Sequence, residues 1–296
     1  MTKKILSILA AGLFATGTAF SQDAAGVAMT FAARPVDAVS YSLGGVTAFH
    51  SAAARLYGKS DLSLSYASFK TSATKSTDLG ADLFLKLGSR FAIGVTYFGE
   101  TGESVDLYEV PGVVSGTFKP KNTAIGGSLA YRFTDAFALG VSVRSLKTKL
   151  TSSDDLSAVG IDIMASGNIS GLKYAAGVTN LGGKVEGASG EKYPIPGAFS
   201  AALRRAFALS GNHSIEANLQ GDIFFKGGLR LGAGVQYSYG GWAFVRAGYS
   251  HGGDTVLPSY PSVGLGCNIG KHFSIDATTL LGDLSGTTVA GLKWIF

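Results

Sequence analysis

The four histidines are the first residues to test for chemistry, because an imidazole binds metal ions and acts as a general base. They are His50, His213, His251 and His272, and none has metal-ligand spacing with another histidine or with the single Cys267. The sequence also lacks a strand-to-helix nucleophile elbow, a phosphate-binding loop and an acidic metal cluster. An enzyme would need a His and a Ser from different strands to meet at a rim. We therefore expect no enzyme activity, no metal and no cofactor.

Charged and amide side chains alternate with apolar ones along several segments. In residues 215–226, for example, Ile215, Ala217 and Leu219 share one face, and Glu216 and Asn218 share the other. One such face suits lipid and the other suits water. The predicted inward, lumen-lining residues are Glu216, Gln220, Asp222, Arg230, Gln236 and Arg246. A polar lumen is either a path for solutes or a hydrated interior, and both interpretations stay open.

The alternation predicts β-strands, and their length indicates where they lie. A strand in a soluble sandwich usually has about 5 or 6 residues, whereas these segments are long enough for a tilted membrane strand. The predicted fold is all-β, a transmembrane antiparallel β-barrel of about 14 strands. The predicted strands are 61–70, 76–88, 89–99, 120–133, 135–149, 156–169, 171–182, 196–208, 212–226, 228–239, 241–250, 260–270, 271–282 and 285–296.

The length of each connection depends on whether the strand before it has an even or an odd number. Those after even-numbered strands are tight turns such as Gly88-Ser89 and Gly240-Gly241. The longer ones, 100–119, 183–195 and 251–259, all follow odd-numbered strands. Short turns at one end and longer loops at the other are typical of an outer-membrane barrel with both termini at the periplasmic end. A soluble sandwich has no reason to sort its loops in this way.

The chain ends in an alternating apolar strand with Leu292, Trp294 and Phe296 on one face. We expect these residues to face lipid at the end of the last strand, which pairs with the first strand and removes the sheet edges. A terminal aromatic strand also resembles the signal that the barrel-assembly machinery of the outer membrane reads. The expected partners are therefore outer-membrane lipid and that machinery.

The N-terminal residues predict where in the cell the protein is located. Lys3 and Lys4 precede an apolar run that ends in small residues, so we expect residues 1–21 to be a signal peptide cleaved after Ser21. The full chain carries a formal charge of +5 and only 15% charged residues, which gives no basic patch for nucleic acid. No later segment is apolar for long enough to be a membrane helix. We expect an integral protein of the bacterial outer membrane.

Residues 22–60 fit no strand of this series and precede the predicted barrel of 61–296. They are rich in Ala and Gly but also carry large apolar side chains, which a solvated tail would not need. We expect a segment that plugs part of the lumen, with Phe31, Tyr41 and Phe49 as its buried residues. A flexible periplasmic tail is the alternative.

Two stretches resemble a known family. "ARPVDAVSYSLGGVTA" (33–48) looks like the N-terminal segment of the PorV/PorQ outer-membrane proteins, which are FadL-like fourteen-stranded barrels. "AAGVTNLGGKVEGASGEKYPIPGAFSAALRRAF" (175–207) is similar to that family's strand, "NLGGK" loop and P-x-P segment. The chain departs from the family at 50–56, where "HSAAARL" replaces an Asn-Pro-Ala-Gly-Leu element.

The resemblance implies a partner-binding component associated with type IX protein secretion. The partner-loop candidates, in the 100–119 connection, are Leu107, Tyr108, Val113 and Phe118. The alternative is a FadL-like channel for uptake of hydrophobic small molecules, with a hydrophobic ligand in place of secretion partners and residues 22–60 as the gate. A channel of that kind needs an apolar track, and a scaffold tolerates a plugged lumen. The sequence alone leaves the partner, the ligand, the conductance and the oligomeric state open.

Overall fold

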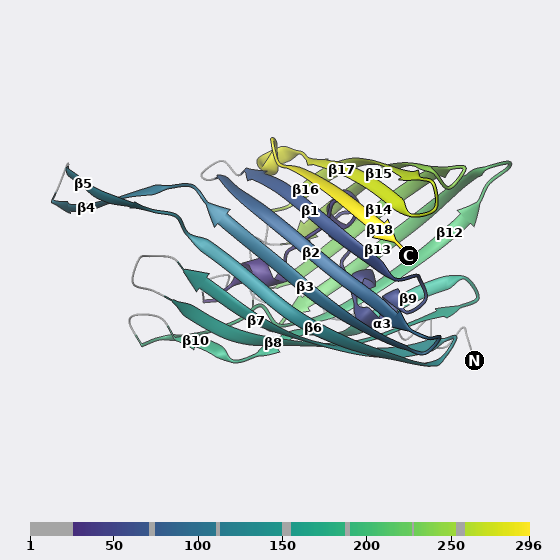
Figure 1. Ribbon diagram of the computed structural model, residues 1–296, viewed down its shortest axis with the longest axis horizontal. Helices are drawn as coiled ribbons and strands as arrows, with labels where there is room; N and C mark the ends of the chain where they lie inside the picture. The colour runs from purple at the N-terminus through teal and green to yellow at the C-terminus, as the bar shows by residue number, and fades with distance from the viewer. Residues whose placement is uncertain are drawn as a thin grey trace.

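The chain folds into a closed antiparallel β-barrel whose interior holds the N-terminal segment (Figure 1). A computed structural model describes residues 26–70, 75–110, 113–149, 155–186, 190–226, 228–252 and 258–296. The predicted signal peptide lies outside these residues and stays a prediction. No helix in the described part of the chain is long and apolar enough to cross a bilayer.

Fourteen strands form the barrel wall, as the sequence predicted. Each pairs antiparallel with the strands on either side, and the predicted bounds agree with the observed ones to within a few residues at each end. The barrel strands are β1 (Asp61–Lys70), β2 (Lys75–Leu87), β3 (Phe91–Gly102), β6 (Lys121–Thr134), β7 (Phe137–Lys149), β8 (Leu156–Ile169), β9 (Leu172–Gly182), β12 (Ala198–Ala208), β13 (His213–Phe224), β14 (Leu229–Tyr239), β15 (Ala243–Gly252), β16 (Tyr260–Ile269), β17 (Phe273–Leu280) and β18 (Thr288–Ile295).

The barrel closes where the first and last strands meet. β1 pairs with β18 from Asp61 opposite Ile295 to Ser68 opposite Thr288. The N–H of Phe296 extends this pairing by donating to the carbonyl of Ser60 at 3.0 Å. Closure leaves no strand edge in lipid, where an unpaired backbone group would cost several kcal/mol.

Two of the long connections contain strands of their own, where the sequence indicated loops. Residues 100–119 continue β3 to Gly102 and then form the hairpin of β4 (Val105–Val110) and β5 (Val113–Phe118). This hairpin extends beyond the barrel in Figure 1. The connection after β9 contains β10 (Lys184–Glu186) and β11 (Lys192–Pro194). β4 pairs with β5 and β10 pairs with β11, and both pairs contain valine, which is enriched in strands.

The outer face of the wall is apolar. Large side chains such as Val95, Ile125 and Leu265 are each more than half exposed. Aromatic side chains gather beside the short turns, where Phe133 lies 5.6 Å from Phe137 between ring centroids. An apolar band with aromatic residues at its border is the surface that a lipid bilayer requires.

The described N-terminal segment lies inside this barrel, and we call residues 26–60 the plug. It consists of η1 (Thr30–Ala33), α2 (Ala38–Ser42), η2 (Ala48–His50) and α3 (Ala52–Arg55), joined by short turns. Ala28 donates its N–H to Pro194 in the long-loop end, and Ser60 meets the C-terminus at the opposite end. A further short helix, η3 (Gly282–Leu284), joins β17 to β18. The plug therefore runs along the lumen from the long-loop end to the short-turn, periplasmic end.

Three wall glycines allow the plug to approach the wall closely, and we call Gly232, Gly234 and Gly248 the glycine floor. The turn at Leu43 and Gly44 rests on them. A Cβ atom on Gly248 would lie 2.2 Å from the nitrogen of Gly44, and one on Gly234 would lie 2.5 Å from the Cα of Leu43. Gly44 has φ +72°, a left-handed conformation that glycine adopts at little cost. Backbone lies against backbone here, so a side chain at the floor would displace the plug.

We predict that Gly248→Val destabilises the folded protein by about 1–3 kcal/mol, the usual cost of overpacking. The measurement is the urea midpoint of the detergent-solubilised protein, together with the rate of trypsin cleavage in the plug. Gly127→Val is the matched control, because a Cβ on Gly127 meets no atom closer than 3.9 Å. Equal midpoints and cleavage rates for the two variants would contradict the role of the floor.

Candidate functional site: the plugged lumen

A cavity of about 530 Å³ lies inside the barrel between the plug and the wall. This volume is within the range of about 300–1,000 Å³ that small-molecule sites occupy. Its lining includes Ala32, Phe98 and Ala124, which belong to an apolar cluster of plug and wall residues. It also includes Lys59 and Lys173, which are exposed near the periplasmic end. The cavity therefore joins an apolar region to a charged one.

The plug depends on the wall for many of its hydrogen bonds, because its helices are only three to five residues long. Arg144 Nη1 donates to the carbonyl of Ala32 at 3.1 Å, and Thr278 Oγ1 donates to that of Ala38 at 2.6 Å. Ser65 Oγ donates to the Val36 carbonyl at 2.8 Å. Buried backbone carbonyls need such partners. Many of the polar side chains in the lumen therefore hold the plug in place.

Gln220 and Asp222 form the largest of these wall networks. Gln220 Oε1 accepts the backbone N–H groups of Thr47 at 2.7 Å and Ala48 at 2.9 Å. Its amide nitrogen donates to Asp222, which also forms an ion pair with Arg230 at 2.9 Å. All three wall side chains are less than 10% exposed. The network is buried and paired, so it fixes η2 against β13.

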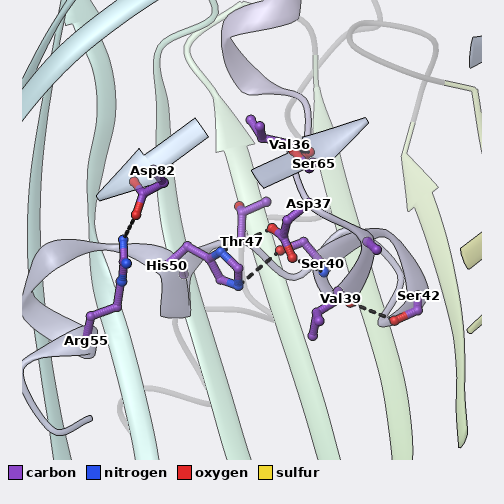
Figure 2. A network of polar contacts seen from close by, with 12 residues as sticks. Val36, Asp37, Val39, Ser40, Ser42, Thr47, His50, Arg55, Ser65 and Asp82 are labelled. Carbon is purple, nitrogen blue, oxygen red and sulfur yellow. Dashed lines mark hydrogen bonds and ion pairs between the residues drawn. The ribbon is translucent and has the colours of Figure 1, made fainter. Parts of the chain in front are cut away.

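Two plug arginines form ion pairs with the strands of β1 to β3. Arg34 lies 3.2 Å from Asp78 and 3.0 Å from Glu100, between their carboxylates. Arg55 lies 2.8 Å from Asp61 and also contacts Asp82, and its guanidinium stacks on the Phe84 ring. Figure 2 shows the Arg55–Asp82 pair. These charges fix both ends of the plug to the same part of the wall.

Asp37, Ser40 and His50 point toward one another within the plug (Figure 2). His50 Nδ1 lies 3.1 Å from Asp37, and His50 Nε2 lies 3.3 Å from Ser40 Oγ. The other Asp37 oxygen accepts the N–H of Ser40 at 2.9 Å and so caps α2. The residue types are those of a hydrolytic triad. Ser40 is only 1% exposed, and the trio ties α2 to η2.

The surroundings of His50 disfavour its charged form. Enclosure away from water lowers the pKa of His50, Asp37 opposes this change, and the positive charges of Lys293 and Arg204 lower it further. The side chain remains 40% exposed to the lumen. The sequence pattern does not distinguish His50 from the other three histidines, because His50 lies outside the predicted strands.

The structure places the six lumen candidates on the inner face of β13, β14 and β15. Gln220, Asp222 and Arg230 belong to the network described above. Arg246 forms an ion pair with Asp276 at 2.7 Å and donates to Gln236 at 2.6 Å. Glu216 lies 3.4 Å from Arg204. None of these contacts shows a solute path.

Of the remaining candidates, Phe31, Tyr41 and Phe49 are buried in the plug. Phe31 stacks on Phe98 with ring centroids 6.0 Å apart, and Phe49 lies under Arg204 at 4.3 Å.

The C-terminal candidates lie on the outer face of β18. Leu292, Trp294 and Phe296 are each nearly half exposed. The partner-loop candidates lie in the β4–β5 hairpin, Leu107 and Tyr108 in β4, Val113 and Phe118 in β5. The side chains of the first three lie outside the described part of the structure.

Sequence reasoning missed several lumen residues. Arg144, Asp162 and Asn180 meet at one point of the wall, where Arg144 Nη2 donates to the Asn180 side chain at 2.6 Å and lies 3.2 Å from Asp162. The signal was present in the strand 137–149, where Arg144 stands in the inward register beside Ser142 and Gly140. The letters G-x-S-x-G also occur at 248–252, but they lie within β15, where Ser250 is buried in a strand.

Comparison with known proteins supports the fold. The CymD monoaromatic hydrocarbon channel matches with a TM-score of 0.59 at 12% identity, covering 88% of this chain and 97% of that chain. The P. putida toluene transporter TodX matches with a TM-score of 0.57 at 12% identity, covering 89% of this chain and 99% of that chain. No protein-family model matches, and no curated protein sequence does. The chain has a FadL-like fourteen-strand barrel fold.

We predict that Asp222→Leu costs about 3–5 kcal/mol of stability, because it leaves the buried Arg230 without a counter-charge. Asp222→Leu combined with Arg230→Met removes both charges and should recover a large part of the loss. Denaturant unfolding of the purified barrel measures both effects. Glu216→Gln, on the same strand but 22% exposed, is the control and should change little. A double variant no more stable than the single one would contradict the pairing.

Proposed function

We propose that this protein is an outer-membrane channel for small hydrophobic molecules, with the plug as its gate. The observation that carries the proposal is the cavity, whose outer end is lined by Ala32, Phe98 and Ala124 of an apolar cluster. The same cluster contains Met29 and Phe31 from the plug. An apolar molecule that reached this end of the cavity would contact Ala32, Phe98 and Ala124 and gain by leaving water.

The two solved structures of similar fold are named as a monoaromatic hydrocarbon channel and a toluene transporter. Their likeness to this chain shows the fold, and their names support a channel more than a secretion partner. The cavity wall also carries charged side chains such as Arg144 and Asp162, so the apolar cluster lines only part of the cavity.

The partner-binding hypothesis associated with type IX secretion has one observation in its favour. The β4–β5 hairpin extends beyond the barrel, and Val105 at its base is 53% exposed (Figure 1). No comparison supports membership of the PorV/PorQ family. We therefore keep this role as the second candidate, with cross-linking through the hairpin as its test.

We predict that locking the plug to the wall slows entry of a hydrophobic probe. A Cβ on Gly291 would lie 3.6 Å from the Cβ of Ala38, which suits a disulfide between α2 and β18. Ala38→Cys and Gly291→Cys are combined with Cys267→Ala to remove the native thiol. The probe is N-phenyl-naphthylamine, whose fluorescence rises as it crosses the outer membrane of intact cells.

Cells expressing the locked variant should take up the probe several times more slowly when the disulfide is oxidised than when it is reduced. Cys267→Ala with Ala38→Cys alone is the matched control and should not respond to oxidation. If cells expressing the wild-type protein or either variant took up the probe no faster than cells that lack the protein, the channel proposal would be wrong.

A further inference from the structure

Four strands of the barrel wall present the same series of outward-facing side chains near the long-loop end. The series is a large apolar residue, then a serine or threonine, then a lysine, at alternate positions that share one face of the strand. The apolar members are each about half exposed and all four lysines are exposed, so this face is the outer one. The four series are Tyr66, Ser68 and Lys70 of β1, Leu79, Thr77 and Lys75 of β2, Ile125, Thr123 and Lys121 of β6, and Val143, Ser145 and Lys147 of β7.

These strands form one arc of the barrel, with β3 between β2 and β6 (Figure 1). Lys149 at the end of β7 is exposed on the same face as Lys147. On the strands from β12 to β18 and their connections, the described residues at the long-loop end include one exposed lysine, Lys226. Lys184 and Lys192 lie apart, in β10 and β11. We call Lys70, Lys75, Lys121, Lys147 and Lys149 the lysine row.

The lysine row contains two pairs of like charges that the strand register places directly opposite each other. Lys70 of β1 stands opposite Lys75 of β2, and Lys121 of β6 stands opposite Lys149 of β7. Opposed residues on one face have Cβ atoms about 4.5–5.5 Å apart, and like charges at such positions destabilise a sheet. Among the described residues, the one lysine that forms an ion pair is Lys192, with Glu186. The repulsion within each pair is therefore not relieved by a described carboxylate.

Acidic residues also occur at this end of the barrel. Glu103 follows β3 beside Lys75, where its N–H donates to the Lys75 carbonyl at 3.2 Å, and Asp155 precedes β8. The side chains of Glu109 and Asp154 lie outside the described part of the structure. The described exposed acids are Glu103, Asp106, Asp155 and Asp283. They lower the net charge of the rim, but none belongs to the strand pairs β1–β2 and β6–β7, so none lies between two opposed lysines.

The row begins where the apolar band ends. In each series the lysine is four residues beyond the large apolar side chain, a distance of about 13 Å along the strand. The hydroxyl group of a serine or threonine lies between them. A phosphorylated glycolipid has the matching order of groups, with acyl chains first and then sugar hydroxyl groups and phosphates. Lysine is a common ligand of phosphate, and clusters of lysines bind anionic lipid headgroups.

We propose that the lysine row binds the phosphate groups of a glycolipid of the lipopolysaccharide class, with one phosphate between the two lysines of each opposed pair. In an outer-membrane barrel the long-loop end faces the cell exterior, so the row meets the outer leaflet. The inference goes beyond the proposed channel. It requires the barrel to lie in the outer membrane, and it does not require the lumen to conduct.

The test titrates the detergent-solubilised full chain with fluorescently labelled diphosphoryl lipid A and with the same lipid after removal of its phosphates. The wild-type protein should bind the phosphorylated lipid about tenfold more tightly. Lys121→Gln with Lys149→Gln should lose most of this preference without changing the affinity for the dephosphorylated lipid. Lys70→Gln with Lys75→Gln is the second row variant and should act in the same direction.

The matched control is Lys226→Gln with Lys271→Gln, which removes two exposed lysines outside the row and changes the net charge by the same amount. It should keep the preference of the wild-type protein. Urea midpoints give a second readout. In detergent alone, the row variants should unfold at the same urea concentration as the wild-type protein or a higher one, because they lose opposed like charges. Phosphorylated lipid A should raise the midpoints of the wild-type and control proteins more than those of the row variants.

Three results would overturn the proposal. The first is equal affinity of the wild-type protein for the two lipids, and the second is a preference that survives in both row variants. The third is displacement of the phosphorylated lipid by an equal concentration of inorganic phosphate, which would show that the row does not select a lipid. None of these results bears on the channel, because the row faces away from the lumen.

Discussion

The closure of β1 onto β18 is the constraint on which the rest of this structure depends. Every backbone N–H and C=O group of a strand in lipid needs a partner, and a sheet meets this need only by closing on itself. Closure brings the residues before β1 and the C-terminal Phe296 to the same end of the barrel, where Ser60 and Phe296 are hydrogen-bonded. Residues 26–60 then have an enclosed space beside them, and they fill it.

Filling that space creates a second requirement. The plug has short helices and many turns, so its carbonyls and N–H groups need partners from the wall. Arg144, Ser65 and Thr278 bind plug carbonyls, and Gln220 binds two plug N–H groups. Where no polar partner is available, the glycine floor lets backbone approach backbone. Many polar side chains of the lumen are therefore needed to hold the plug. Only the lining residues that do not bind the plug are free to contact a solute.

The cavity-lining residues that do not bind the plug differ between the two ends of the cavity. One end includes Ala32, Phe98 and Ala124 of an apolar cluster, and the periplasmic end includes Lys59 and Lys173. The cavity therefore combines apolar and charged surfaces without any contribution from the β4–β5 hairpin.

The sequence by itself determined the fourteen strands, their lipid-facing sides and the parity of the turns. It could do so because the side to which a strand residue points depends only on whether its position is odd or even. Only the tertiary structure decided that Gly44 rests on Gly234 and Gly248, that His50 reaches Asp37 and Ser40, and that Arg204 lies over Phe49. The plug has no period from which a face can be read, and contacts such as Thr47 with Gln220 join positions 173 residues apart. The partners of such residues are set by barrel closure, which places distant strands around one enclosed segment.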